Sequence, residues 1–305
     1  MATQKEVKNR IASVKNIHKI TRAMEMVAAA RLRRAEQRID AMRPYAQAIR
    51  KMTQRVSEAA AGIPRIALLE EREQVSRVGI ILVTGDRGLA GAFNTNIIRE
   101  GLRLKREFDG EGATVSFAVV GRRGNSTLTF RGEEIANSYV GFTDRPAFTD
   151  ARSISRDVTS AYVDEDLDRV ELIYNRYVSP LTQYVRRQTL LPLQHAEVFG
   201  EGIPEPEEPA DAELAEAHEK AYWDYEPEPE HLLPMLFEEY VDLSLYRALL
   251  ESAASELGAR MTAMRSAAEN AQDMIGDLTL EMNRVRQAEI TQEILEVVGG
   301  AEALG

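Results

Sequence analysis

Apolar residues recur at alternating spacings of four and three near both ends of the chain. In the first part, this spacing joins Val7, Ile11 and Val14 and then resumes at Ala28, Leu32, Ala35, Ile39, Met42, Ala46 and Ile49. In the last part, eleven successive positions from Leu250 to Val285 are apolar. Such a pattern places the apolar side chains on one stripe of a coiled-coil helix. It predicts two long helices, over residues 1–61 and 235–305.

Each of these patterns slips by one residue at one place. In the first helix the spacing lands on His18, Thr21 and Glu25, whereas the apolar residues are Ile17, Ile20, Met24 and Val27. In the last helix it lands on Glu289 and Gln292, whereas the apolar residues are Ile290, Ile294 and Val297. We expect the buried seam to step by one residue at both places, as it does at a stammer in a coiled coil.

The two helices are expected to pair with each other. A long helix is stable in water only if it buries its apolar seam against a partner. Residues 1–60 hold 14 Lys and Arg against 5 Asp and Glu, whereas residues 241–305 hold 5 Arg against 11 acids. Opposite charge favours the pairing, and a compact segment between the two helices makes the pair antiparallel. The expected element is an antiparallel coiled coil.

The middle of the chain has the pattern of an α/β domain. β-Branched runs at residues 77–84, 113–120, 135–142, 170–178 and 184–191 predict strands, and helical spacing separates the first four of them, over residues 92–108, 123–130 and 147–163. Alternation of strands and helices predicts a Rossmann-like βαβ domain with a mainly parallel sheet over residues 62–200. Residues 201–234, which are rich in Glu and Pro, are expected to form an acidic loop.

The turn Gly85–Gly91, between a strand and a helix, is the one candidate for a phosphate-binding site. Its glycine spacing, GxxGxxG, matches neither dinucleotide binding nor a P-loop. The chain has no cysteine, its four histidines are scattered, and no nucleophile elbow is present. We therefore expect no catalytic residue, metal site or cofactor. Two alternatives stay open: a nucleotide-dependent enzyme using this turn, with the helices as a dimerisation arm, and a coiled-coil adaptor that homodimerises.

Charge and hydropathy argue against two kinds of partner, nucleic acid and the membrane interior. The net charge of −11 and the presence of only one aromatic residue, Tyr45, in the first helix argue against nucleic acid. No apolar run approaches the length of a membrane span, so we expect no direct membrane insertion. The charged N-terminal residues carry no secretory signal, which makes the cytosol the expected compartment.

Several segments resemble the γ subunits of F-type ATP synthases. ASVKNIHKITRAMEMVAAARLRRA (12–35) with RPYA (43–46) is similar to the opening helix of that family, and GDRGLAGAFN (85–94) to its glycine turn. ESAASELGARMTAMRSAAENA (251–271) and LTLEMNRVRQAEITQEILEVVGGA (278–301) are similar to its closing helix. One departure is Ala90, where the family commonly has cysteine; nothing in the predicted mechanical role requires a thiol there.

The resemblance implies a mechanical function without an active site. The coiled coil would be the central rotor inside a ring of three α and three β subunits. It would couple proton-driven rotation of the c-ring to ATP synthesis, with the ε subunit beside it, at the cytoplasmic face of the cell membrane. By the same resemblance, Lys19, Arg22 and Met24, together with Arg87 and Ala90 of the turn, would contact the β subunit lever. Arg286, Gln287 and Thr291 would form a polar catch with a β loop.

Overall fold

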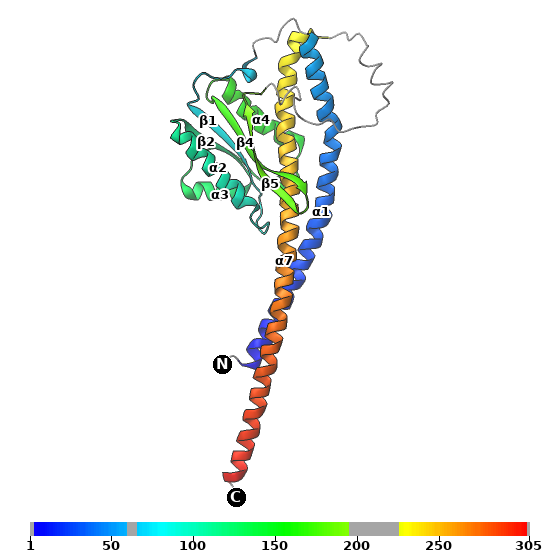
Figure 1. Ribbon diagram of the computed structural model, residues 1–305, viewed down its shortest axis with the longest axis vertical. Coiled ribbons are helices and arrows are strands. Elements are labelled where there is room, and N and C mark those ends of the chain that lie inside the picture. Colours follow the sequence, from blue (N-terminus) through cyan, green and yellow to red (C-terminus); the bar gives the residue numbers. More distant parts are fainter. Residues whose placement is uncertain (1–2, 60–65, 195–225, 304–305) are drawn as a thin grey trace, which may run out of the picture. The chain divides into compact units, whose positions relative to one another are not determined.

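The computed structural model describes residues 3–59, 66–194 and 226–303, with the side chains of 299–303 left out (Figure 1). The chain forms two compact units. One contains residues 1–32, 89–91 and 257–305, and the other contains residues 33–88 and 92–256. The first unit is built from helix alone apart from the short turn at 89–91, whereas the second holds the sheet and its covering helices.

The second unit contains a five-stranded sheet of order β3-β2-β1-β4-β5. The strands are β1 (Arg77–Val83), β2 (Thr114–Val120), β3 (Ile135–Tyr139), β4 (Arg169–Ser179) and β5 (Thr182–Leu191). The first four pair in parallel, whereas β5 runs antiparallel to β4. A turn of two residues joins β4 to β5, too short for the crossover that a parallel strand requires. The expected Rossmann-like domain with a mainly parallel sheet is therefore confirmed.

Helices cover both faces of this sheet (Figure 1). α2 (Phe93–Gly110) and α3 (Arg122–Arg131) lie on one face, where Gly101 brings α2 close to Leu82 and Phe117. On the other face, a core containing Ile81, Leu172 and Tyr174 packs against α4 (Phe148–Val163), the 3-10 turn η1 (Ala67–Leu69) and the first turns of α7 (Pro229–Ala303). Both faces are buried, which explains why β1 and β2 are almost continuously apolar.

α1 (Gln4–Ala59) and α7 are single helices that contact each other in antiparallel orientation within each unit. In the first unit, the Gln4 N–H donates to Glu289 and Glu25 binds Arg265. In the second, the Tyr45 hydroxyl donates to Glu239. The predicted antiparallel pairing is thus confirmed, and it occupies the seams that the homodimer alternative would require. α7 begins inside the predicted loop 201–234, at Pro229, and the loop's residues 201–225 lie outside the described residues.

The predicted steps of the seam are wrong. The original spacing continues through the first helix, because Thr21 and Glu25 are buried while Ile17 and Ile20 are half exposed or more, the latter at 59%. The polar side chains are satisfied locally: the Thr21 hydroxyl donates to the carbonyls of Ile17 and His18. In α7, Glu289 is partly buried and accepts the Gln4 N–H, whereas Ile290 and Gln292 are both exposed, so the buried seam neither steps nor continues there. Hydrogen bonding therefore decides the register where apolarity alone predicted a shift.

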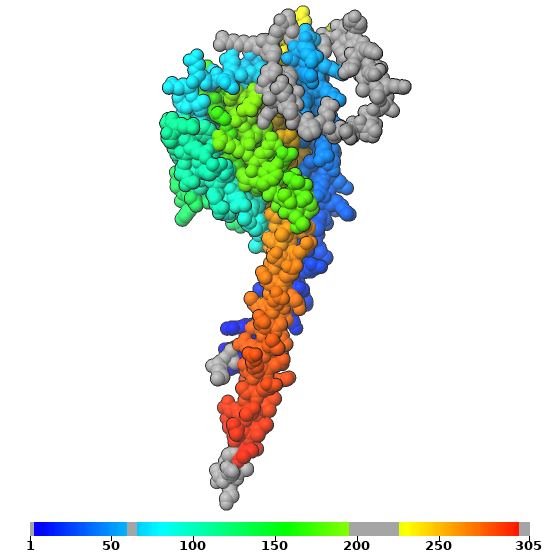
Figure 2. Space-filling view, in the orientation of Figure 1, coloured from blue at the N-terminus to red at the C-terminus, as the bar shows by residue number. Residues whose placement is uncertain are grey.

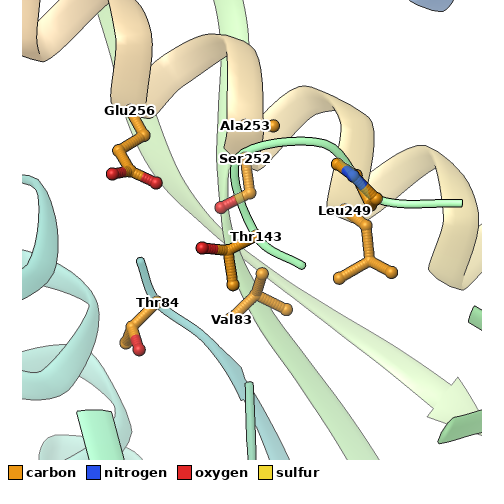
Figure 3. Close-up of a pocket in the computed structure, with 8 residues that line it drawn as sticks. Val83, Thr84, Thr143, Leu249, Ser252, Ala253 and Glu256 are labelled. Carbon is orange, nitrogen blue, oxygen red and sulfur yellow. The ribbon is translucent and has the colours of Figure 1, made fainter. Parts of the chain in front are cut away.

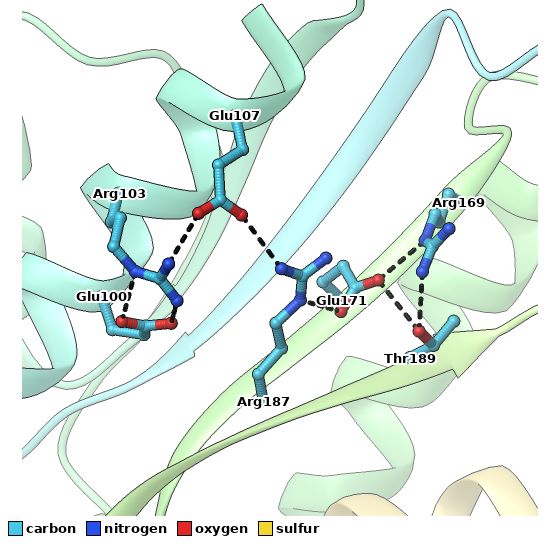
Figure 4. Close-up of polar contacts among 7 residues, drawn as sticks. All are labelled: Glu100, Arg103, Glu107, Arg169, Glu171, Arg187 and Thr189. Atoms are coloured by element: carbon cyan, nitrogen blue, oxygen red, sulfur yellow. Dashed lines mark hydrogen bonds and ion pairs between the residues drawn. The ribbon is translucent and has the colours of Figure 1, made fainter. Parts of the chain in front are cut away.

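A buried carboxylate ties β4 to β5 and α2 (Figure 4). Glu171 is fully buried and accepts hydrogen bonds from Arg169 at 2.7 Å, Arg187 at 3.1 Å and the Thr189 hydroxyl at 2.9 Å. Arg187 also binds Glu107 of α2 at 3.1 Å. A buried charge is tolerated only when it is paired and hydrogen bonded, as it is here. The network fixes the antiparallel edge of the sheet to the helix that covers it.

Candidate functional site

The crevice where a doubly wound sheet would bind a nucleotide is closed in the second unit. From β1 the chain adds β2 and β3 on one side and then β4 and β5 on the other, so the topological switch point lies between the parallel strands β1 and β4. Doubly wound folds bind ligands beyond the carboxyl ends of the strands at this point. α7 crosses this point, and Ser252 and Glu256 point toward Thr84 and Thr143 (Figure 3). The remaining space is about 10 Å³, enough for one water molecule. No nucleotide fits there.

Gly85, the first residue of the candidate phosphate turn, lies directly against Glu256. A Cβ atom added at Gly85 would come within 2.7 Å of the Glu256 carboxyl group. The glycine therefore serves close packing of the turn against α7, and the adjacent carboxylate would repel a phosphate. These two features argue against the nucleotide-dependent enzyme.

Asp86 organises the same turn by accepting four hydrogen bonds. Its donors are the N–H groups of Gly141, Thr143 and Arg122 and the Thr143 hydroxyl, at 2.9–3.2 Å. Burial by itself would raise the pKa of Asp86, but these hydrogen bonds together hold that pKa below its usual value. A carboxylate with its acceptors filled in this way is a structural anchor and is not a free base.

The turn residues expected to touch a partner differ in exposure. Arg87 is exposed and forms an ion pair with Asp144 at 3.4 Å, whereas Ala90 is only 2% exposed. Leu89, which the sequence did not single out, is 64% exposed and adopts a positive φ of 63°. A positive φ is costly for leucine, and such backbone strain concentrates at functional sites. The turn thus exposes Arg87 and Leu89 and buries Ala90.

α1 carries a second apolar stripe in the first unit, outside the seam. Ile17, Ile20 and Val27 are exposed, and Met24 lies between them and is partly buried. At 100° per residue these four side chains lie within about 80° of one another around the helix. Lys19 and Arg22 are also exposed, but at 100° per residue they lie about 120° and 180° around the helix from the middle of the stripe. An apolar stripe on a helix whose seam is already filled is a surface suited to another protein.

α7 continues past the first turn of α1 with its side chains exposed. Gln4, the first residue of α1, contacts Glu289, and the exposed residues that follow include Ile294, Leu295, Val297 and Val298. Figure 2 shows this last stretch of α7 as an exposed surface. Arg286, Gln287 and Thr291 are exposed as well, and the Thr291 hydroxyl donates to the Gln287 carbonyl at 2.8 Å. An apolar helix end of this kind also requires a partner.

The part of the chain that the structure describes contains neither a metal site nor a membrane-spanning helix. Within residues 3–59, 66–194 and 226–303, no group of three or more histidines and acids is placed to hold a metal ion. No helix in those ranges is both long enough and apolar enough to cross a membrane.

These features define a class of protein: an α/β protein with an antiparallel coiled coil, whose exposed apolar surfaces suit larger protein partners. A family model described as ATP synthase matches residues 3–304. The ATP synthase gamma chain of Rubrobacter xylanophilus is 40% identical and is covered over 99% of its length, with 100% of this chain. That of Moorella thermoacetica is 41% identical over the full length of both chains.

Solved structures agree with this relationship. A chain from the central stalk and c-ring of the Tetrahymena thermophila mitochondrial ATP synthase is 28% identical, with a TM-score of 0.58 over 81% of this chain and 99% of that chain. A chain of the Euglena gracilis mitochondrial enzyme, 20% identical, shares the fold with a TM-score of 0.66. The protein belongs to the ATP synthase gamma chain family. It is the central-stalk subunit of the F-type enzyme and is not a catalytic subunit.

Proposed function

We propose that this chain turns inside a ring of three α and three β subunits and couples proton-driven c-ring rotation to ATP synthesis at the β subunits. It would sit at the cytoplasmic face of the cell membrane as a peripheral component, with the ε subunit beside it. The observation that carries the proposal is the outward apolar stripe Ile17–Val27, because the seam of the coiled coil is already filled and the stripe still needs a partner.

We assign the stripe, together with the basic residues named above, to contact with the β subunit lever. Met24 would supply apolar contact, while Lys19, Arg22 and Arg87 would attract the lever's acidic side chains. Exposed charges of this kind speed and steer encounter more than they tighten binding, which suits a shaft that must release each β subunit in turn. Ala90, which is buried, would support the contact that Leu89 and Arg87 make.

The polar catch is assigned to α7. Arg286, Gln287 and Thr291 are exposed near the level where α1 begins, so a β loop could reach them without displacing α1. A guanidinium group and an amide provide directional hydrogen bonds that form in one rotational position and break in the next.

Reconstitution with α and β subunits tests the rotor. We expect ATPase activity of the α–β ring to rise when this chain is added, and proton pumping to follow when the membrane sector is present. Failure of the chain to co-assemble with the ring would refute the proposal.

The catch is tested separately with Arg286→Glu. We expect weaker coupling between hydrolysis and pumping, with the helical circular dichroism unchanged. Arg284→Glu is the matched control, since Arg284 is also exposed but lies about 200° around the helix from Arg286. Equal loss of coupling in both variants, or unfolding of the Arg286 variant, would count against the assigned role.

A further inference from the structure

The second unit contains an open groove that neither the sheet nor the rotor surfaces use. Its volume is about 350 Å³, within the 300–1,000 Å³ typical of small-molecule sites. The lining comes from three helices: Arg38, Ala41, Met42 and Tyr45 of α1, Phe148 of α4, and Leu243 and Tyr246 of α7. Met42 and Leu243 are buried and form an apolar floor, continuous with a small core cluster.

The aromatic walls of this groove are held in place. The Phe148 and Tyr246 rings meet edge to face, with centroids 5.5 Å apart. Arg152 lies over the Phe148 ring at 5.2 Å and is itself bound to Asp242 at 3.0 Å and Glu239 at 3.1 Å. Glu239 in turn accepts the Tyr45 hydroxyl at 2.9 Å. A groove whose walls are fixed before binding loses little conformational entropy when a ligand enters.

Arg38 supplies the charge of the groove itself. Glu239 and Asp242, the acids nearby, are bound to Arg152 and Tyr45. Arg38 lines the groove, and no carboxylate among the described residues forms an ion pair with it.

We propose that this groove binds a small aryl carboxylate, with its ring system between Tyr45, Phe148 and Tyr246 and its carboxylate on Arg38. Aromatic groups prefer offset or edge-to-face contact, which three rings around an apolar floor provide. A guanidinium group matches a carboxylate with paired hydrogen bonds. The volume accommodates a ring system of two fused rings. The site is independent of the rotor function.

Met42 gives a direct reporter for the test. The full chain is labelled with ¹³C-methyl methionine and titrated with 2-naphthoate, using Met42→Leu to identify the signal. We expect the Met42 methyl signal to move through the ring current of the ligand, with a Kd of about 1 mM for a ligand of this size. Met274, which is exposed and lies 28 residues beyond the lining residue Tyr246 along α7, should stay unmoved.

The charge contribution is tested with matched ligands and variants. We expect the neutral 2-naphthamide, and the variant Arg38→Gln with 2-naphthoate, to bind about tenfold more weakly. Arg43→Gln is the control: Arg43 is exposed, pairs with Asp40, and does not line the groove. Ala41→Phe should block binding by filling the groove, with unchanged circular dichroism as the check on folding.

Several results would overturn the proposal. One is a Met42 signal that stays fixed at 10 mM ligand. Another is equal binding of acid and amide, or equal effects of Arg38→Gln and Arg43→Gln. Binding to the isolated chain that is lost in the assembled synthase would identify the groove as a subunit interface, which also refutes a ligand site.

Discussion

The polar break in the coiled-coil seam offers the sharpest test of the structure. Glu25 is buried in the seam between α1 and α7, where it accepts hydrogen bonds from Arg265 at 3.0 Å and Arg22 at 2.7 Å. The hydrogen bond from Arg265 outweighs the effect of burial and lowers the pKa of Glu25 below its usual value of 4.5. The change to make is Glu25→Gln, which keeps the shape and removes the charge.

The loss of stability expected in Glu25→Gln follows from the hydrogen bonds that Arg265 and Arg22 donate to Glu25. A hydrogen bond to a charged group contributes about 1.5–3 kcal/mol when buried. The side chains of Arg22 and Arg265 are half exposed, so water screens both interactions, and we expect a total loss of about 1.5–2 kcal/mol. Glu25→Leu should lose less stability than Glu25→Gln, because leucine adds apolar contact in the seam and the half-exposed Arg22 and Arg265 side chains can turn to water.

Amide hydrogen exchange measures this effect where it occurs. Peptides covering residues 18–32 and 258–270 should exchange about tenfold faster in Glu25→Gln, whereas peptides from the sheet stay unchanged. The folded pKa lies below the unfolded pKa. The stabilisation is therefore complete above the unfolded pKa and is lost as pH falls through the folded pKa. Below that pH, the difference between wild type and Glu25→Gln should disappear.

Two results would refute the reasoning. Exchange in Glu25→Gln identical to wild type at pH 7 would mean that the carboxylate contributes nothing to the seam. Exchange in Glu25→Leu faster than in Glu25→Gln would mean that the position does not face the partner helix. The second outcome would restore the stepped seam, with Ile17 and Ile20 buried.

Three further predictions concern the α/β unit. Gly121→Ala should lower the free energy of unfolding in urea by at least about 3 kcal/mol, because φ is 94° and the added Cβ would lie 2.3 Å from the Thr84 carbonyl oxygen. Gly110→Ala is the control and should leave that free energy unchanged, because no atom lies within 4 Å of the added Cβ. Glu171→Gln should cost about 1–2 kcal/mol by the same measurement, since the buried side chain loses its charge-assisted hydrogen bonds to Arg169 and Arg187, which are about one third exposed and partly screened by water. Burial raises the pKa of Tyr162 to about 12, so stability present below pH 10 should fall as pH rises toward 12, and Tyr162→Phe should remove that step.

Much of the fold could be predicted because the decisive interactions are local or periodic. The β-branched runs at 77–84 and 113–120 match β1 and β2 to within one residue, since strands buried on both faces are almost entirely apolar. The eleven-residue seam of α7 is buried from Leu250 to Ala271 and partly buried from Ile275 to Val285. For the strands and for the seam, the pattern of apolar residues that are close in sequence is enough to predict the element.

The candidate surfaces were harder to predict, because apolarity does not say which partner covers a side chain. Ile20 and Val27 are as apolar as the seam residues, yet they face outward. Glu25 faces inward because it binds Arg265, which is 240 positions away in the sequence. The same holds for the glycine turn. Whether Gly85 faced a phosphate or a helix depended on Glu256, which no local pattern connects to it.

The sequence by itself determined the two long helices, their opposite charges, the α/β pattern between them and the family. Those features rest on periodicity, composition and motif, all of which neighbouring residues encode. Only the tertiary structure decided that the seam keeps its register through Thr21 and Glu25, that α7 closes the nucleotide crevice, and that three helices enclose an aromatic groove. Each of those depends on contacts between residues far apart in the chain, where hydrogen bonding and close packing select among arrangements that hydrophobicity alone leaves equal.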